Sequence, residues 1–182
     1  MRLIGPATLA TILTCTALGC SSSPAAPGGV PIPAGTHHSA IASVTGPGSG
    51  GVSVSPKAIP EATFAADISL LIAEARPNAT YIIQRAPEIG RALAADGVCQ
   101  RALGMAPWSA SDPAAPAFIT FALATGPAIL ATAANGTGFA NFEFRAPTIP
   151  AGTVFDVMFR LVDSETAPAT ELRSGCFTVT AK

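Results

Sequence analysis

The chain has 182 residues, with ten Lys/Arg against eleven Asp/Glu and a net charge of −1 at pH 7. A nucleic-acid binder needs an excess of basic residues, so the charge argues against that class. Apolar residues make up 49% of the chain and charged residues only 12%, where about 25% charged is usual. The composition therefore excludes a highly charged disordered chain and fits one globular domain with accessory segments.

The N-terminus has the pattern of an export signal. Arg2 is followed by an apolar, Thr-rich run that contains Gly and Pro, which is typical of a signal-peptide core rather than a membrane-spanning helix. The run ends in Ala17-Leu18-Gly19-Cys20, which resembles the bacterial lipobox, although Ala17 stands where that motif prefers Leu. The resemblance implies that residues 1–19 are removed and that Cys20 is acylated. An ordinary secretory peptide with an incidental Cys20 is the alternative.

Residues 20–51 are expected to form a lipidated Cys followed by a flexible tether. The segment is rich in Pro, Gly and Ser and has no Asp, Glu, Lys or Arg. A coil of this length has a root-mean-square reach of about 30 Å, enough to hold a domain off a membrane surface. His37 and His38, the two histidines of the chain, fall in this tether. Two ligands without a scaffold do not make a defined metal site, so we expect none.

From Val52 onward the sequence predicts β-strands. Segment 63–72 alternates with a period of two, which places Phe64, Ile68 and Leu70 on one face. An amphipathic helix is the alternative for this segment. Further strands are expected at residues 52–54, 80–85, 118–123, 129–133, 139–144, 154–162 and 176–180.

The strand at 154–162 should direct Phe155 and Phe159 inward and Asp156 and Arg160 outward. Asn135-Gly136 is a strong hairpin signal, because this pair tolerates positive φ. Residues 88–95 could form one or two helical turns, and 103–116 should form a long loop. About eight short strands without a long helix predict an all-β sandwich.

Four loose motifs follow one another over residues 52–182. They are Val52-x-Val54-x-Pro56 with Ile59-Pro60, Arg76–Tyr81, Asn135–Gly138 and Ile149–Val157. In this order they resemble bacterial immunoglobulin-like domains. The resemblance implies a single immunoglobulin-like antiparallel β-sandwich of about seven to nine strands. The second and sixth strands lack the Cys of antibody domains, and Phe155 stands where a corner Tyr is common. A fibronectin-like variant is therefore equally open.

The predicted domain offers little for catalysis. It holds no His, which argues against Ser-His-Asp, Cys-His and HExxH systems, and no phosphate loop, dinucleotide fingerprint or other cofactor motif appears. Asp163-Ser164-Glu165 could bind calcium, but the full loop pattern is missing, so a solvated polar turn is expected. Most other carboxylates are expected in outward pairs with a nearby Arg: Glu143 with Arg145, Asp156 with Arg160, and Glu171 with Arg173.

Two features of the domain are candidate sites. The loop with Met105 and Trp108, the single Trp, either anchors a partner or folds back over the core. Cys99 and Cys176 remain after Cys15 is assigned to the signal and Cys20 to lipid. In an oxidising compartment this pair is expected to form a disulfide.

These observations predict a non-enzymatic, lipid-anchored protein of the bacterial cell envelope. The membrane would be its partner through Cys20, and its extracytoplasmic domain would have a binding or structural role toward a protein or glycan. The alternative is a secreted β-sandwich hydrolase or carbohydrate-binding module with an acidic cleft.

Overall fold

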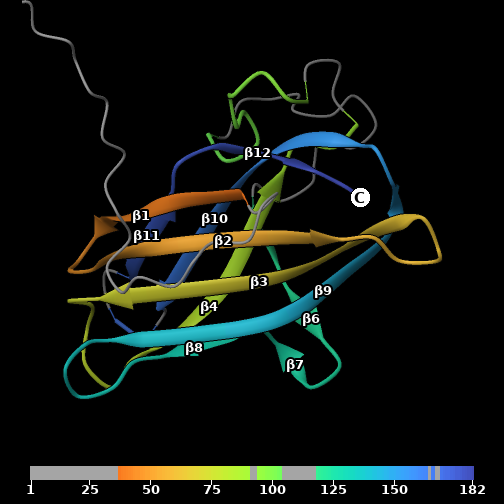
Figure 1. Cartoon of the computed structure of the whole chain (residues 1–182). Helices are drawn as coiled ribbons and strands as arrows, with labels where there is room; N and C mark the ends of the chain where they lie inside the picture. The colour runs from red at the N-terminus through yellow and green to blue at the C-terminus, as the bar shows by residue number, and fades with distance from the viewer. Residues whose placement is uncertain (1–36, 91–93, 104–117, 164, 167–168) are drawn as a thin grey trace, which may run out of the picture. The chain divides into compact units, whose positions relative to one another are not determined.

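The computed structural model describes residues 37–90, 94–103, 118–163, 165–166 and 169–182. All of them lie in the second of two compact units, Pro31–Lys182. This part of the chain is all-β (Figure 1). It contains no helix long and apolar enough to cross a membrane.

Twelve strands are present in the described residues, more than the seven to nine expected, because several have only two or three residues. They are β1 (His37–Thr45), β2 (Ser49–Lys57), β3 (Thr63–Ala73), β4 (Thr80–Pro87), β5 (Ile119–Thr120), β6 (Ala122–Leu123), β7 (Gly126–Pro127), β8 (Ile129–Ala131), β9 (Gly138–Pro150), β10 (Val154–Asp163), β11 (Thr170–Ser174) and β12 (Phe177–Thr180). Of the segment 88–95, expected to hold helical turns, the described residues 88–90 and 94–95 are not helical.

Ten of these strands form one antiparallel sheet. Its order is β5-β4-β10-β11-β1-β2-β3-β9, and β6 and β7 form a separate pair. Two of the long strands each pair with two short strands. β10 pairs β12 near its start and β11 near its end, and β4 pairs both β5 and β8. The sheet curls, so that β1, β2, β3 and β9 cross in front of β4 and β10 (Figure 1).

The first strand corrects the expected start of the folded domain. Residues 37–51, assigned to the flexible tether, form β1 and the beginning of β2. His37 pairs with Val54 and His38 with Ser53, so both histidines belong to the sheet. The argument that the domain lacks His was therefore wrong. No group of three or more His, Cys, Asp or Glu side chains that could hold a metal occurs among the described residues.

The alternation of β3 and β10 is confirmed for the apolar positions. Phe64, Ile68 and Leu70 are buried from β3, which excludes the helical alternative, and Phe155 and Phe159 are buried from β10. Phe64 and Phe155 meet edge to face, with ring centroids 5.5 Å apart. In the sheet order, β10 and β3 are separated by β11, β1 and β2. The contact between their side chains therefore requires the sheet to curl around one common core.

Asp156 was expected on the outer face, paired with Arg160, and this was wrong. Its side chain is fully buried. Oδ2 accepts a hydrogen bond from the backbone N–H of Gly97 at 2.6 Å, and Oδ1 accepts one from the Thr178 hydroxyl at 2.6 Å. The segment around Ala94 covers this end of β10, so the outward position is not solvated.

The predicted turn at Asn135-Gly136 is confirmed, but the strands on either side, β8 and β9, are joined only by the bridge between Thr132 and Gly138. Gly136 has φ 75°, and a Cβ at this position would lie 2.3 Å from the carbonyl oxygen of Ala75. The carbonyl of Gly136 in turn accepts a hydrogen bond from the N–H of Ala75 at 3.1 Å. Glycine is therefore required both for the turn and for its close contact with the end of β3.

Asp163 was expected in a solvated turn, but it is fully buried at the end of β10. Nε of Arg76 donates to its Oδ2 at 2.6 Å, and Nη2 of Arg76 lies 2.5 Å from the same oxygen. Arg76 joins the β3–β4 connection to β10 through this ion pair. Hydrogen bonding to Asp163 raises the pKa of Arg76.

We expect Asp163→Asn to lower the free energy of unfolding by about 2 kcal/mol, because the buried acceptor of the Arg76 hydrogen bonds loses its charge, while Arg76 is one third exposed and keeps Glu165 at 3.6 Å. Urea denaturation at pH 7 measures the change. Glu143→Gln is the control: Glu143 pairs at the surface with Lys57 at 2.9 Å and with Arg145 at 2.7 Å, and such exposed pairs contribute little to stability. Equal losses in the two variants would contradict the buried role of Asp163.

The expected Cys99–Cys176 disulfide is present, with Cα atoms 5.6 Å apart and a sequence separation of 77. A second, small core lies against Ala86 of β4 and is separate from the main core. It is formed by Ala86, Cys99, Ala102 and Phe118, and Cys176 packs against it. The disulfide therefore ties the segment of residues 94–103 to the strands that it covers.

Replacing both cysteines by Ala should lower the free energy of unfolding by about 2–4 kcal/mol. Chemical denaturation measures this loss, and reductant should destabilise the wild type but not the double variant. Peptide mapping without reductant should recover a Cys99–Cys176 linked peptide. Two alkylatable thiols in protein isolated without reductant would contradict the assignment.

Candidate functional site: an arginine-lined apolar cavity

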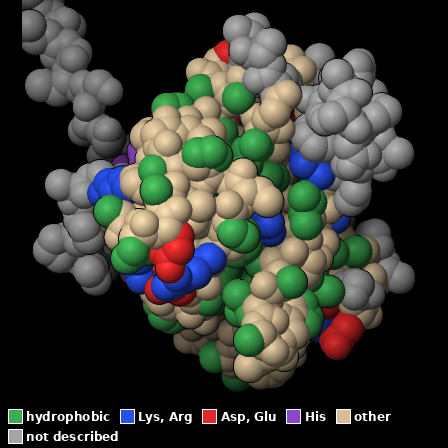
Figure 2. Space-filling view, turned by 90° about the vertical axis from the view of Figure 1, so that its right-hand side faces the viewer, with side chains coloured by type: hydrophobic (Ala, Val, Ile, Leu, Met, Phe, Trp, Pro, Cys, Tyr) green, Lys and Arg blue, Asp and Glu red, His purple; other side chains and the backbone are tan. Residues whose placement is uncertain are grey.

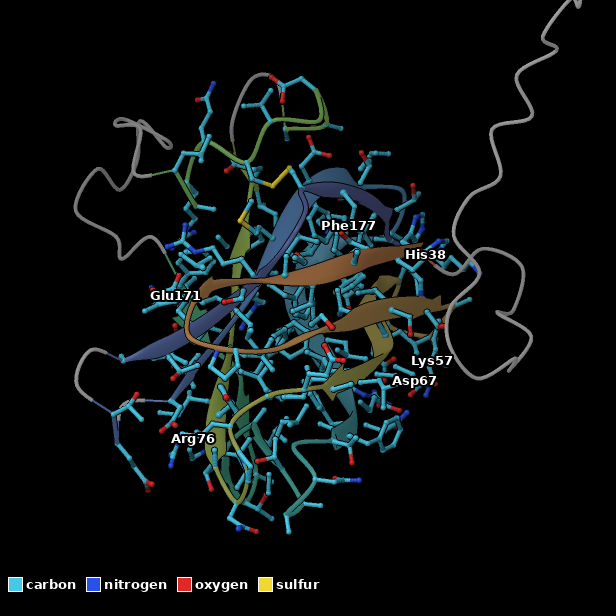
Figure 3. All side chains as sticks on the ribbon, turned by 90° about the vertical axis from the view of Figure 1, so that its left-hand side faces the viewer. His38, Lys57, Asp67, Arg76, Glu171 and Phe177 are labelled. Carbon is cyan, nitrogen blue, oxygen red and sulfur yellow. A yellow bond between two sulfur atoms is a disulfide. The ribbon has the colours of Figure 1, made fainter. Side chains whose placement is uncertain are left out.

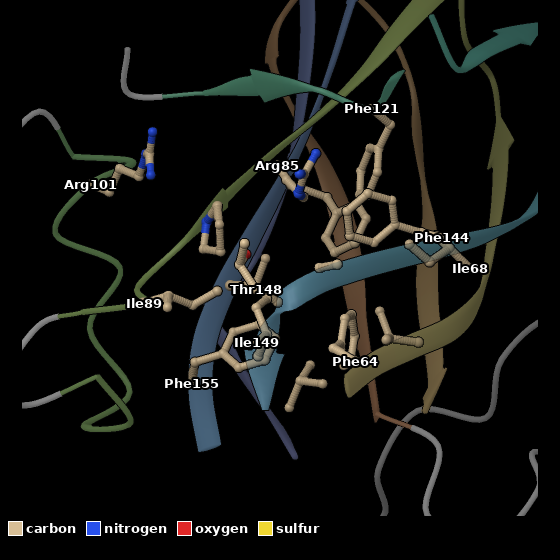
Figure 4. Close-up of a pocket in the computed structure, with 16 residues that line it drawn as sticks. Phe64, Ile68, Arg85, Ile89, Arg101, Phe121, Phe144, Thr148, Ile149 and Phe155 are labelled. Carbon is tan, nitrogen blue, oxygen red and sulfur yellow. The ribbon is translucent and has the colours of Figure 1, made fainter. Parts of the chain in front are cut away.

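A cavity with a volume of about 250 Å³ lies inside the curled sheet (Figure 4). Apolar side chains form most of its wall, together with two arginines and one threonine. The lining residues are Val54, Phe64, Ile68, Arg85, Pro87, Ile89, Arg101, Phe121, Phe144, Ala146, Thr148, Ile149, Phe155, Val157, Phe159 and Val179.

The cavity arises where the curl does not close. The bridge between Thr132 and Gly138 joins the two ends of the sheet at the start of β9. No strand among the described residues pairs with the same edge of β9 farther along. The inward side chains Phe142, Phe144 and Ala146 are accordingly only half-buried. The open part of β9 thus forms one wall of the cavity, and β4 and β10 form another.

Phenylalanine rings pack this wall in crossed pairs. Phe121 meets Phe144 edge to face with centroids 5.0 Å apart, and it stacks on Phe159 at 5.5 Å. Such arrangements are favourable because a ring edge is positive and a ring face is negative. These contacts hold the rings in place, so that they form an apolar wall of the cavity.

Arg85 brings a positive charge into this surface. In β4, Tyr81, Ile83 and Arg85 follow each other at every second residue, so Arg85 occupies the inward register. Its guanidinium carbon lies 4.5 Å from the centroid of Phe121 and 4.3 Å from that of Phe144. Figure 4 shows the guanidinium beside these two rings.

No described residue forms an ion pair with the guanidinium of Arg85. Its Nη1 atom is buried, and no described residue accepts a hydrogen bond from it. Burial lowers the pKa of Arg85 to about 10, and the positive charge of Arg101 contributes in the same direction. Arg85 is still cationic at neutral pH, so the cavity holds a desolvated positive charge.

Arg101 approaches the cavity from the disulfide-bonded segment. It is buried, with only 4% of its surface exposed, and its backbone N–H donates to Oε1 of Glu88 at 2.6 Å. Cys99 lies two residues earlier, so the Cys99–Cys176 disulfide fixes the position of this second arginine. The described lining therefore contains two cationic side chains and no Asp or Glu.

None of the described carboxylates lines the cavity: some form outer ion pairs, and Glu88, Asp156 and Asp163 are buried at other places. The expected pairs Glu143–Arg145 and Glu171–Arg173 are present. Lys57 lies between Glu143 and Asp67, and Figure 3 shows the Lys57 and Asp67 side chains together. A second hollow, about 440 Å³ and bounded by Ala122–Thr125 and Phe142–Arg145, has Glu143 as its one carboxylate among the described lining residues.

Charged side chains are sparse on the surface as well. Figure 2 shows one face on which acidic and basic side chains meet in small clusters, separated by hydrophobic and uncharged atoms. This face has no extended charged stripe, in agreement with the nearly neutral composition.

Of the predicted site residues, the structure brings Cys99 and Cys176 together. Cys20, Met105 and Trp108 lie outside the described residues. Sequence reasoning missed Arg85 and Arg101. The signal for Arg85 was present, since the period of two in β4 places a charged residue on the apolar face. The signal for Arg101 was absent, because its segment is irregular.

Comparison with known proteins found no matching family model, no matching curated protein and no matching solved structure.

Arg85→Met should leave the free energy of unfolding unchanged or raise it by up to about 1 kcal/mol. Met keeps the apolar stem and removes a buried donor without an acceptor, which costs about 1–3 kcal/mol. The lost cation–π contacts, about 1–2 kcal/mol, partly offset this gain. Chemical denaturation at pH 7 measures the result, with Phe121→Ala as the destabilising control at about 3–5 kcal/mol. A loss above 2 kcal/mol in Arg85→Met would assign Arg85 to the structural core.

Proposed function

We propose that this chain is an exported, lipid-anchored protein of the bacterial cell envelope whose β-domain binds a ligand without transforming it. Export and anchoring are supported by the apolar N-terminal run and by the lipobox-like Ala17–Cys20. The tether of this proposal is shorter than the sequence pattern indicated and covers residues 21–36, since β1 begins at His37. The Cys99–Cys176 disulfide agrees with an oxidising compartment.

We further propose that the domain is a divergent member of the immunoglobulin-like or fibronectin-like sandwiches. The order of the sequence motifs and the antiparallel, two-layered arrangement of the strands support this relation. The continuous pairing through β1 would be its main departure, because the two sheets of a sandwich are ordinarily separate.

The observation that carries the binding function is the apolar cavity with the cationic Arg85 side chain in its lining. A concave apolar site with a few convergent polar groups is the usual form of a small-molecule site. The alternative, a hydrolase or carbohydrate-binding module with an acidic cleft, needs at least one free carboxylate at the site. The described cavity lining offers arginines instead.

Mass spectrometry of the membrane fraction tests the anchoring. We expect an N-terminal peptide that begins at Cys20 and carries added acyl mass. Cys20→Ser should be released from the membrane or stay uncleaved, because its hydroxyl replaces the thiol that accepts the lipid. Cys15→Ser is the matched control and should behave as the wild type. A freely soluble wild type with an unmodified N-terminus would contradict the proposal.

A further inference from the structure

We propose that the cavity binds a small organic anion, with its acid group on the guanidinium of Arg85 and its flat apolar body against the phenylalanine rings. The inference rests on the proposed binding function and names its ligand class.

The anionic part follows from the charges. The guanidinium of Arg85 lines the cavity and forms no ion pair with a described residue, and guanidinium groups bind carboxylates and phosphates in a planar, two-point geometry. The other charged residue of the described lining, Arg101, has the same sign. These like charges would repel a cationic ligand, whereas an acid group would supply Arg85 with a counter-charge.

The apolar part follows from the remaining wall. Away from the two arginines, the lining is formed by Phe, Ile, Val, Ala and Pro side chains and Thr148. Phe64 and Phe155 meet at 82° and Phe121 and Phe144 at 84°, so each pair presents a ring face and a ring edge. A flat aromatic ligand can stack on such faces or meet such edges.

The volume limits the size of the ligand. A dry apolar cavity of about 150 Å³ accommodates benzene, and this cavity measures about 250 Å³. The space thus suits an acid with a body of one or two fused rings. It is too small for a peptide helix or a full-length lipid, so the ligand is a small molecule.

Isothermal titration calorimetry at pH 7 with the whole chain, produced as Cys20→Ser and purified without detergent, tests this inference. The probes share one naphthalene body: 2-naphthoate, 2-naphthyl phosphate, neutral 2-naphthol and cationic 2-naphthylmethylammonium. We expect 2-naphthoate or 2-naphthyl phosphate to bind at least tenfold more tightly than 2-naphthol, and the ammonium not to bind. The tighter of the two anions identifies the acid group.

Substitutions then assign the anion to Arg85. Arg85→Met should weaken binding of the preferred anion at least tenfold and leave 2-naphthol within twofold, and Arg85→Lys should retain part of the anion preference. Arg160→Met is the matched control, because the Arg160 guanidinium lies 4.5 Å from the Phe118 centroid, outside the cavity lining. It should bind all probes as the parent protein does.

The outcomes separate the two proposals. Equal affinity for 2-naphthoate, 2-naphthyl phosphate and 2-naphthol would overturn the anion inference and keep the binding function. An equal loss in Arg85→Met and Arg160→Met would also overturn it. Absence of binding for all four probes would overturn both the inference and the use of this cavity as the binding site.

Discussion

The backbone pairing of β1 on both of its edges makes the domain one structure. Residues 37–42 pair with β2, and Ile41–Thr45 pair with β11. Without this strand, β2, β3 and β9 would form one sheet and β4, β10 and β11 another, each with an additional edge. Because the pairing is continuous, the sheet can curl around its apolar face, to which β1 contributes the buried side chain of Ile41. The curl closes at Gly138 and stays open beyond it, which creates the cavity.

The two cores of the domain serve different purposes. The inner core, with its crossed phenylalanine rings, supplies most of the buried apolar surface. The outer core around Cys99 and Phe118 is small and depends on a covalent bond to hold its irregular segment in place. Through Arg101 this segment contributes to the cavity, while Arg85 comes from the sheet itself. Both arginines place charge where apolar side chains would pack better, and such a local conflict is typical of functional sites.

The sequence revealed the strands whose apolar residues alternate, as in β3 and β10, and the turn at Asn135-Gly136. It did not reveal β1, because a run dominated by His, Ser and Ala has little apolar alternation, and one of its two partners, β11, lies more than 100 residues away. Asp156 and Asp163 were misplaced for a related reason: the segments that bury them are distant in sequence. The disulfide followed from cysteine counting, whereas the cavity depends on the path of β9 and could not be predicted from local patterns.

The open edge of β9 bears on how copies of the molecule behave toward each other. A long unpaired strand edge is a template on which another copy can add its own strand, and so form extended assemblies. Here the strand carries two prolines, Pro147 and Pro150, which have no backbone N–H to offer. Glu143 and Arg145 place charges on the stretch before them, and an added strand would remove water from these charged side chains. The same edge that leaves the cavity accessible is thus protected against self-templated growth by its own sequence.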